Sequence, residues 1–199
     1  MKNHILIALL CLVVLPGCKK AVDAIIEKGT SSSSKNSGFI EYSIAKGGQY
    51  CDQNSLKAVE TQEMKFQVKF DSTAIYQTAH AENQYDINKL YGFSDNNADH
   101  HQFSARFGWR WSNKALHLFA YVYNNGAVIS RELAIVDIGK EINCSIQVTS
   151  SSYLFSVNGV SERMPRMATT PNAKGYQLYP YFGGDEVAPH DIHIWIRNL

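Results

Sequence analysis

The stretch that decides the fold is Gln102–Tyr123, which reads Q-F-S-A-R-F-G-W-R-W-S-N-K-A-L-H-L-F-A-Y-V-Y. Apolar and polar residues alternate on both sides of Ser112-Asn113-Lys114, and successive strand side chains point to opposite faces of a sheet. The stretch therefore predicts a β-hairpin that turns at these three residues. The predicted core face carries Phe103, Ala105, Phe107, Trp109 and Trp111 from the first strand and Leu116, Leu118, Ala120 and Val122 from the second.

The opposite face of this hairpin carries the candidate ligand-binding residues. It presents Arg106, Arg110, His117, Tyr121 and Tyr123. Phenol rings offer an apolar face for stacking, and guanidinium groups offer donors in a fixed geometry that suits carboxylates. We therefore predict a ligand-binding surface on this face, although these residues alone do not identify the ligand. A later expected strand would extend the surface through Asn143, Ser145 and Gln147.

The first 17 residues have the composition of a secretion signal. Lys2 is followed by an apolar run from Ile5 to Leu15, which is too short for a permanent membrane-spanning helix. Leu15-Pro16-Gly17-Cys18 then resembles the lipobox of bacterial lipoproteins, although Pro16 departs from the usual small residue. The resemblance implies a lipid on Cys18 and a membrane anchor, and the absence of aspartate after Cys18 favours the outer membrane. An ordinary signal peptide is the alternative.

The remaining chain is expected to form a tether and one domain. Residues 18–38 contain the lipidated cysteine and the run Ser31-Ser32-Ser33-Ser34, which cannot bury enough apolar surface to fold and predicts a flexible linker. Residues 39–199 are long enough for one domain with a proper core. Loss of Lys2 with the signal leaves 18 basic and 18 acidic side chains, a balance that excludes wholesale nucleic-acid binding.

The domain is predicted to be all-β. Aromatic residues make up 12% of the chain, and short alternating runs are separated by Gly, Asn and Ser without a long helical pattern. Many short strands favour a two-sheet antiparallel sandwich, because each sheet needs a face to bury. Besides the hairpin, strands are expected at 39–45, 64–70, 87–93, 131–136, 142–148, 153–158, 161–164, 176–182 and 192–197.

The C-terminal end resembles a known fold family. Y-Q-L-Y-P-Y-F-G-G at 176–184, Pro189-His190-Asp191 and the closing I-H-I-W-I at 192–196 resemble the last strands of concanavalin A-like lectin/glucanase jelly rolls, especially those in lipoproteins of glycan-foraging bacteria. The resemblance implies a jelly-roll β-sandwich and a carbohydrate partner. It includes no catalytic signature, so it implies fold more than function.

Three functions stay open, of which we expect lectin-like binding. Arg106, His117 and Tyr121 supply the residue types of an alginate-type lyase, and Arg131-Glu132-Leu133 resembles one lyase motif, but the Q-I-H and K-A-G-x-Y elements of that family are missing. The paired-carboxylate strand E-x-D-x-x-E of jelly-roll glucanases is missing too. The third alternative is a structural or adhesion lipoprotein without a small ligand.

No metal or cofactor is predicted. Asp95, Asn97 and Asp99 have the spacing that opens a calcium loop, but His100 replaces the required glycine and Arg106 the closing glutamate. His100 and His101 are adjacent, and on an extended chain they would point apart, which disfavours a shared zinc ion. A structural Ca²⁺ is the alternative, since jelly rolls of this resemblance often carry one beside the closing strand, where Asp185, Glu186 and Asp191 lie.

Cys51 and Cys144 are the cysteines left for a disulfide. Cys11 leaves with the signal and Cys18 takes the lipid, and a secreted domain meets oxidising conditions. A bridge would close a loop of about 90 residues and stabilise the fold by roughly 4 kcal/mol. The alternative is a buried free thiol, because Cys144 lies in an apolar row with Ile142 and Ile146.

Overall fold

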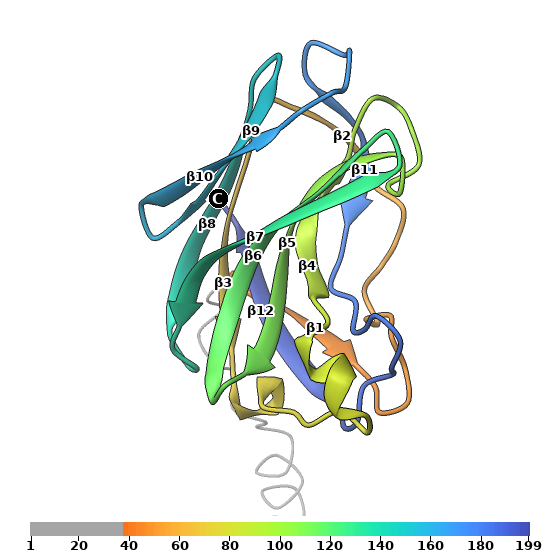
Figure 1. The fold of residues 1–199 in the computed structure, drawn as a ribbon. Coiled ribbons are helices and arrows are strands. Elements are labelled where there is room, and N and C mark those ends of the chain that lie inside the picture. The colour runs from red at the N-terminus through yellow and green to blue at the C-terminus, as the bar shows by residue number, and fades with distance from the viewer. Residues whose placement is uncertain (1–37) are drawn as a thin grey trace, which may run out of the picture. The chain divides into compact units, whose positions relative to one another are not determined.

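The computed structural model describes residues 38–199, which form two antiparallel sheets packed face to face (Figure 1). The first sheet has the strand order β1-β12-β3-β8-β9-β10, and the second has the order β2-β11-β4-β5-β6-β7. The predicted all-β sandwich is therefore confirmed. The predicted signal peptide, the lipidated Cys18 and nearly all of the tether lie outside the described residues. Within the described residues, no helix has the length and apolar character needed to cross a membrane.

The strands are short and mostly follow the predicted runs. The first sheet consists of β1 (Ile40–Ile44), β12 (Ile192–Asn198), β3 (Glu63–Phe70), β8 (Glu141–Val148), β9 (Ser152–Val157) and β10 (Val160–Pro165). The second consists of β2 (Ala58–Thr61), β11 (Ala173–Leu178), β4 (Asn88–Ser94), β5 (Phe103–Ser112), β6 (Ala115–Asn124) and β7 (Ala127–Val136). Two short 3-10 helices, η1 (Ser72–Ala74) and η2 (Ala81–Tyr85), precede β4. The strand expected at 176–182 lies earlier in the chain, since β11 begins at Ala173 and ends at Leu178.

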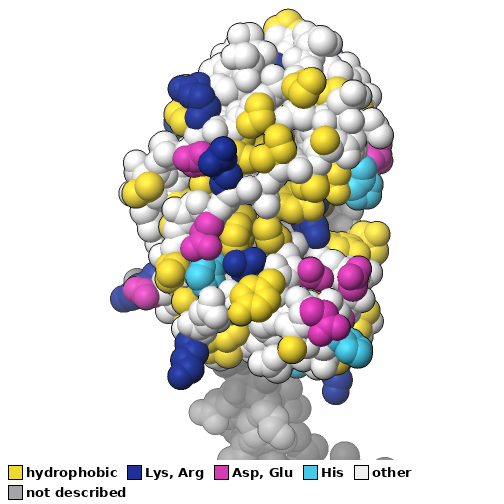
Figure 2. Space-filling view, in the orientation of Figure 1, with side chains coloured by type: hydrophobic (Ala, Val, Ile, Leu, Met, Phe, Trp, Pro, Cys, Tyr) yellow, Lys and Arg dark blue, Asp and Glu magenta, His cyan; other side chains and the backbone are white. Residues whose placement is uncertain are grey.

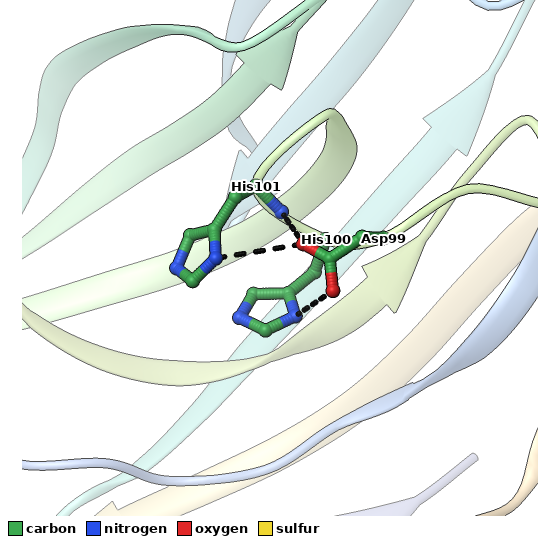
Figure 3. A group of neighbouring side chains, drawn as sticks. All are labelled: Asp99, His100 and His101. Carbon is green, nitrogen blue, oxygen red and sulfur yellow. Dashed lines mark hydrogen bonds and ion pairs between the residues drawn. The ribbon is translucent and has the colours of Figure 1, made fainter.

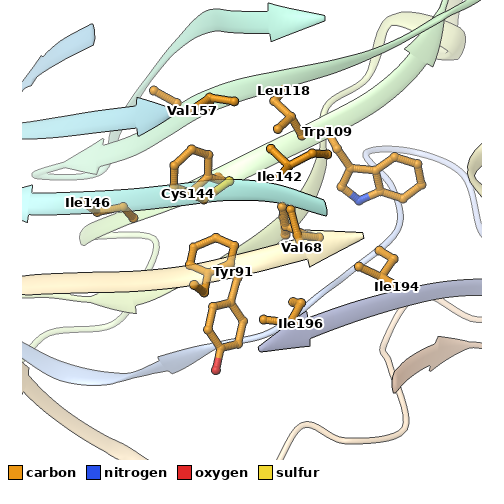
Figure 4. Close-up of a cluster of buried hydrophobic side chains, with 14 of the residues drawn as sticks. Val68, Tyr91, Trp109, Leu118, Ile142, Cys144, Ile146, Val157, Ile194 and Ile196 are labelled. Atoms are coloured by element: carbon orange, nitrogen blue, oxygen red, sulfur yellow. The ribbon is translucent and has the colours of Figure 1, made fainter. Parts of the chain in front are cut away.

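Aliphatic and aromatic side chains from both sheets fill the space between them (Figure 4). Phe66 of β3 meets Phe107 of β5 with ring centroids 5.5 Å apart, in the edge-to-face arrangement that aromatic pairs favour. Trp109 is fully buried and packs on Phe70. Trp111 is half-buried against the same cluster. Alternation along β5 therefore placed both tryptophans on the correct side.

The β5–β6 hairpin forms where it was predicted, but its turn is one residue shorter, because Ser112 belongs to β5 and pairs with Ala115. Arg106 lies opposite Tyr121, and Trp109 lies opposite Leu118. Asn113 and Lys114 have φ angles of 51° and 61°, which is typical of the two-residue turn that matches strand twist. The outward face of the hairpin is more covered than alternation alone suggests, since only 7% of Arg106 and 7% of His117 are exposed.

The predicted disulfide is wrong. Cys51 and Cys144 are both buried free thiols. Cys51 forms a β-bridge with Ile44 at the free edge of β1. Cys144 belongs to β8, and β12 and β3 lie between β1 and β8. Four strand spacings separate the two positions, or about 19 Å, and a disulfide needs Cα atoms within about 7 Å.

The expected extension of the polar face is also wrong. Asn143, Ser145 and Gln147 lie on β8, which belongs to the first sheet, whereas the hairpin belongs to the second. Because the inner faces of the two sheets meet in the core, their outer faces lie on opposite sides of the sandwich. These three polar side chains therefore cannot join the surface that contains Arg106 and Tyr121.

Candidate functional site

A cleft of about 540 Å³ opens on the outer face of the second sheet. Its floor comes from β4, β5 and β6, and its walls come from β11, the segment Tyr179–Tyr181 and the chain before β2. This size is within the range usual for small-molecule sites. In Figure 2, basic side chains lie partly recessed among side chains coloured as hydrophobic, which include tyrosine. The lining includes Lys89, Ser104, Arg106, Tyr121, Tyr123, Tyr176 and Gln177.

Arg106 lies at the floor of the cleft. Its Nη2 donates a hydrogen bond of 2.6 Å to the carbonyl oxygen of Tyr179. The Nε of Arg106 and the Oγ of Ser104 are buried and have no hydrogen-bond partner among the described residues. Buried polar groups are nearly always paired, so these two unpaired atoms set the floor of the cleft apart from the rest of the domain. Burial lowers the pKa of Arg106 to about 10.

Lys89 of β4 is a second cation in the cleft. Its Nζ donates to the carbonyl oxygen of Gly183 at 2.8 Å and lies 5.3 Å from the centroid of the Tyr121 ring. Burial, followed by the charge of Arg106, lowers the pKa of Lys89 to about 8. Neither cation forms an ion pair with a carboxylate of residues 38–199. The floor is therefore positively charged and suited to an anionic group.

Tyrosine rings surround these cations. Tyr121 and Tyr123 project from β6 with ring centroids 5.8 Å apart, and burial raises the pKa of Tyr121, which keeps its phenol neutral. At the mouth, Tyr50 meets Tyr181 edge to face at 4.9 Å. Tyr50 is 70% exposed, so its ring is free to stack on a ligand.

The structure divides the five predicted binding residues. Arg106, Tyr121 and Tyr123 line the cleft, whereas Arg110 and His117 do not. The Arg110 guanidinium lies 4.7 Å from the Phe119 ring centroid and donates to the carbonyl oxygen of Tyr85.

His117 is held by two acceptors. Its Nδ1 lies 2.9 Å from the Oε1 of Glu132, and its Nε2 lies 3.1 Å from the carbonyl oxygen of Ser112. With both ring nitrogens engaged, His117 has no nitrogen free for a ligand. His117 and Arg110 both contact Ser112, so their side chains stabilise the end of the hairpin that contains the turn.

Several residues that line the cleft were not predicted from the sequence. Lys89 had a usable signal, because it is the one charged residue of the apolar run 87–93. Tyr176, Gln177 and Tyr181 were assigned only to the fold, and nothing local shows that β11 pairs with β4 and brings them beside Arg106.

The acidic residues considered for calcium have other partners. Asp95 is fully buried and bonds Arg166, with Nε to Oδ2 at 2.7 Å. Glu186 accepts from the backbone N–H groups of Ala79 and His80, and Asp191 accepts from that of Lys46. Within the described residues these carboxylates therefore tie loops together separately and form no common cluster.

No known protein family matches the chain, and no curated protein matches it either. Solved structures do resemble it. Alginate lyase AlyC3 matches with a TM-score of 0.55 and 9% identity, over 83% of this chain and 75% of that chain. A family 16 endo-glucanase from Bacteroides ovatus matches with a TM-score of 0.50 and 10% identity, over 81% of this chain and 80% of that chain.

These neighbours define the class of fold. Both are concanavalin A-like jelly rolls, and the two antiparallel sheets of this chain are consistent with that fold. The chain therefore has the concanavalin A-like jelly-roll fold that the C-terminal segment suggested. At 9–10% identity the likeness concerns the fold alone, so the chemistry must be argued from the cleft.

Proposed function

We propose that this chain is a glycan-binding protein whose cleft holds an acidic oligosaccharide. The observation that carries the proposal is the pair Arg106 and Lys89, a buried and a half-buried cation that share one cleft floor without a carboxylate partner among the described residues. Keeping charges away from water is costly unless they are paired. The carboxylate of a uronic acid, or a sulfate ester, would provide the partner.

The remainder of the cleft supports a sugar as the carrier of that charge. Carbohydrates present C–H faces that stack on aromatic rings and hydroxyl groups that need donors and acceptors. Tyr50 and Tyr181 provide rings at the mouth, and Tyr121 and Tyr123 provide phenol groups near the cations. The structural neighbours are a polysaccharide lyase and a glucanase, which supports a carbohydrate ligand.

A matched pair of arginine variants tests the proposal. Arg106→Ala and Arg110→Ala remove the same side chain from the same face of β5, but only Arg106 lines the cleft. Calorimetry of the full chain with a polyuronate oligosaccharide and with a neutral β-glucan oligosaccharide measures both affinity and charge preference. Circular dichroism of each variant checks the fold, and Lys89→Gln is a second probe that retains the arginine.

We expect the wild type to prefer the acidic oligosaccharide. Hydrogen bonds to a charged group contribute about 1.5–3 kcal/mol, so Arg106→Ala should weaken binding by roughly tenfold or more. Lys89→Gln should weaken it as well, and Arg110→Ala should leave it near the wild-type value. Equal affinity for the neutral glycan, or an equal loss in Arg110→Ala, would contradict the proposal.

A polysaccharide lyase is the second candidate function. The favouring observation is a tyrosine–histidine pair at the cleft, with the Oη of Tyr176 2.9 Å from the Nδ1 of His100. In a β-elimination, a base removes the proton beside the uronate carboxylate, the C–H electrons form a C=C bond, and the glycosidic C–O bond breaks. Arg106 would stabilise the charge on the carboxylate, and an acid would protonate the departing oxygen.

The appearance of unsaturated uronate, detected by its ultraviolet absorbance, separates the two candidates. Binding without that absorbance supports the lectin-like function. Absorbance that disappears in Tyr176→Phe would establish the lyase and contradict binding as the main activity.

We also propose that the protein is an envelope lipoprotein, anchored in the outer membrane through Cys18. The motif before Cys18 supports this proposal, because lipid chains on that cysteine would supply the anchor. Cys18→Ser should move the protein from the membrane fraction to the soluble fraction of the cell. Unchanged membrane retention of this variant would contradict the anchor.

A further inference from the structure

Asp99, His100 and His101 gather their side chains at the rim of the cleft (Figure 3). One potential ligand atom from each residue lies within 4.8 Å of those from the other two. The two histidine ring centroids are 4.1 Å apart. The expectation that adjacent histidines point apart is therefore wrong here, and the local backbone explains why.

The backbone at these residues turns instead of running extended. The carbonyl oxygen of Asp99 accepts from the N–H groups of Gln102 and Phe103, as in a single helical turn. The Oδ1 of Asp99 also accepts from the N–H of His101 at 2.8 Å, which fixes the carboxylate under the turn. Both rings consequently lie on the same side as the carboxylate, as Figure 3 shows.

The distances between the donors resemble those within a metal coordination shell. Asp99 Oδ2 lies 3.7 Å from the Nδ1 of His100, and Asp99 Oδ1 lies 3.5 Å from the Nδ1 of His101. Donors at 2.0–2.1 Å from a tetrahedral zinc ion are separated by about 3.3 Å. Both carboxylate–imidazole distances are within a few tenths of an ångström of that value, and all three ligand atoms lie within 4.8 Å of one another, so rotation of the exposed side chains would bring them around one ion.

Tyr176 of β11 completes the cluster from a different strand. Its Oη accepts from the backbone N–H of His100 at 3.1 Å and lies 2.9 Å from the His100 Nδ1 and 3.5 Å from the Asp99 Oδ2. When the phenol donates to Nδ1, that nitrogen carries no proton, and breaking this hydrogen bond would free its lone pair for a metal ion.

We propose that Asp99, His100, His101 and Tyr176 bind one divalent transition-metal ion of the zinc class at the rim of the cleft. Two imidazole nitrogens favour zinc, cobalt, nickel or copper over calcium and magnesium, which prefer all-oxygen shells. The donor side chains reach solvent, with 32% of His100, 65% of His101 and 59% of Asp99 exposed, so an ion has a path to the site. The inference holds whether or not the cleft binds a glycan.

Metal titration of the full chain, freed of metal with a chelator, tests this site. Calorimetry with Zn²⁺ gives stoichiometry and affinity, and the visible absorbance of bound Co²⁺ reports nitrogen-containing, low-coordinate geometry. His100→Ala, His101→Ala and their double variant remove the proposed ligands. His80→Ala is the matched control, because it removes another exposed histidine, whose ring makes no hydrogen bond to any residue between 38 and 199.

We expect one Zn²⁺ per chain, with an affinity at least about tenfold weaker in each single variant, since even residues beyond the first shell contribute that much. The Co²⁺ absorbance should be lost in the double variant and retained in His80→Ala. Circular dichroism of His101→Ala should match the wild type, because its ring is exposed. Absence of Zn²⁺ binding, equal affinity in the double variant, or Ca²⁺ binding as tight as Zn²⁺ binding would each overturn the proposal.

Discussion

Gly92 of β4 lies opposite Arg106 of β5, and a Cβ atom at Gly92 would be 2.5 Å from the Cβ atom of Arg106. Real side chains do not approach so closely, so only glycine fits at this position. Because Gly92 has no side chain, the two strands come together under the cleft and the Arg106 side chain lies over the gap. The shape of the cleft floor therefore depends on Gly92, although this residue has no side chain that could contact a ligand.

Gly92→Ala should destabilise the domain and displace Arg106. The added methyl group meets backbone as well as side-chain atoms, and overpacking of this kind typically costs about 1–3 kcal/mol. Urea denaturation measures the free energy of unfolding, and titration with the acidic oligosaccharide measures the effect on the cleft. Wild-type stability and wild-type affinity together would show that the strands can separate without disturbing the site.

Binding of an acidic ligand should weaken as the pH rises through about 8. The pKa of Lys89 is lowered to about 8, so the side chain is charged below that pH and loses its charge above it. Calorimetry across this pH range should show the decline in the wild type. In Lys89→Arg the decline should shift to higher pH, because a guanidinium keeps its proton there. An affinity that increases with pH would contradict a role for Lys89 as the cation.

Asp95→Asn should destabilise the fold strongly. Asp95 and Arg166 are fully buried side chains that bond each other, and Tyr153 donates a further hydrogen bond of 2.6 Å to Asp95. Removal of one partner from a buried ion pair leaves an uncompensated charge and costs about 3–5 kcal/mol. Denaturation of Asp185→Asn, an exposed carboxylate, provides the comparison and should differ from wild type by no more than about 0.5 kcal/mol.

The same residue should make stability depend on pH in acid. Burial alone would raise the pKa of Asp95, but hydrogen bonds from Arg166 and Tyr153 outweigh it and hold the pKa below its ordinary value. The stabilisation is thus fully present above the unfolded pKa of about 3.9 and is lost as the pH falls through the lower folded pKa. Asp95→Asn should flatten this part of the stability profile. An equally steep acid loss in the variant would assign it to other carboxylates.

Thiol labelling should find Cys51 and Cys144 free. Both are buried and separated by β1, β12 and β3, so they should resist labelling in the folded protein and react once it is unfolded without a reductant. Burial raises the pKa of Cys51 to about 11, which further suppresses the reactive thiolate in the native state. Mass spectrometry of the labelled peptides identifies each site. A linked peptide containing both cysteines would show that they pair.

Much of the fold was predictable because alternation is a local property. Phe107 and Trp109 had to share a face of one strand, and the hairpin was expected between the same two strands. Its register was not predicted, because the turn proved to have two residues instead of three. The two-sheet sandwich followed from the number of half-apolar strands, each of which needed a covered face. The candidate residues Arg106, Tyr121 and Tyr123 were found in the same way, from their side of the strand.

The identity of neighbouring strands was decided only by the tertiary structure. Lys89, Tyr176 and Arg106 share a cleft because β4 lies between β11 and β5, and no local pattern specifies that order. The same nonlocal pairing separated Cys51 from Cys144. Alternation assigns a side chain to a face of its sheet, but the loops that cross that face decide whether it is open. The sequence determined which way side chains point along each strand, whereas packing of distant segments determined which of them meet.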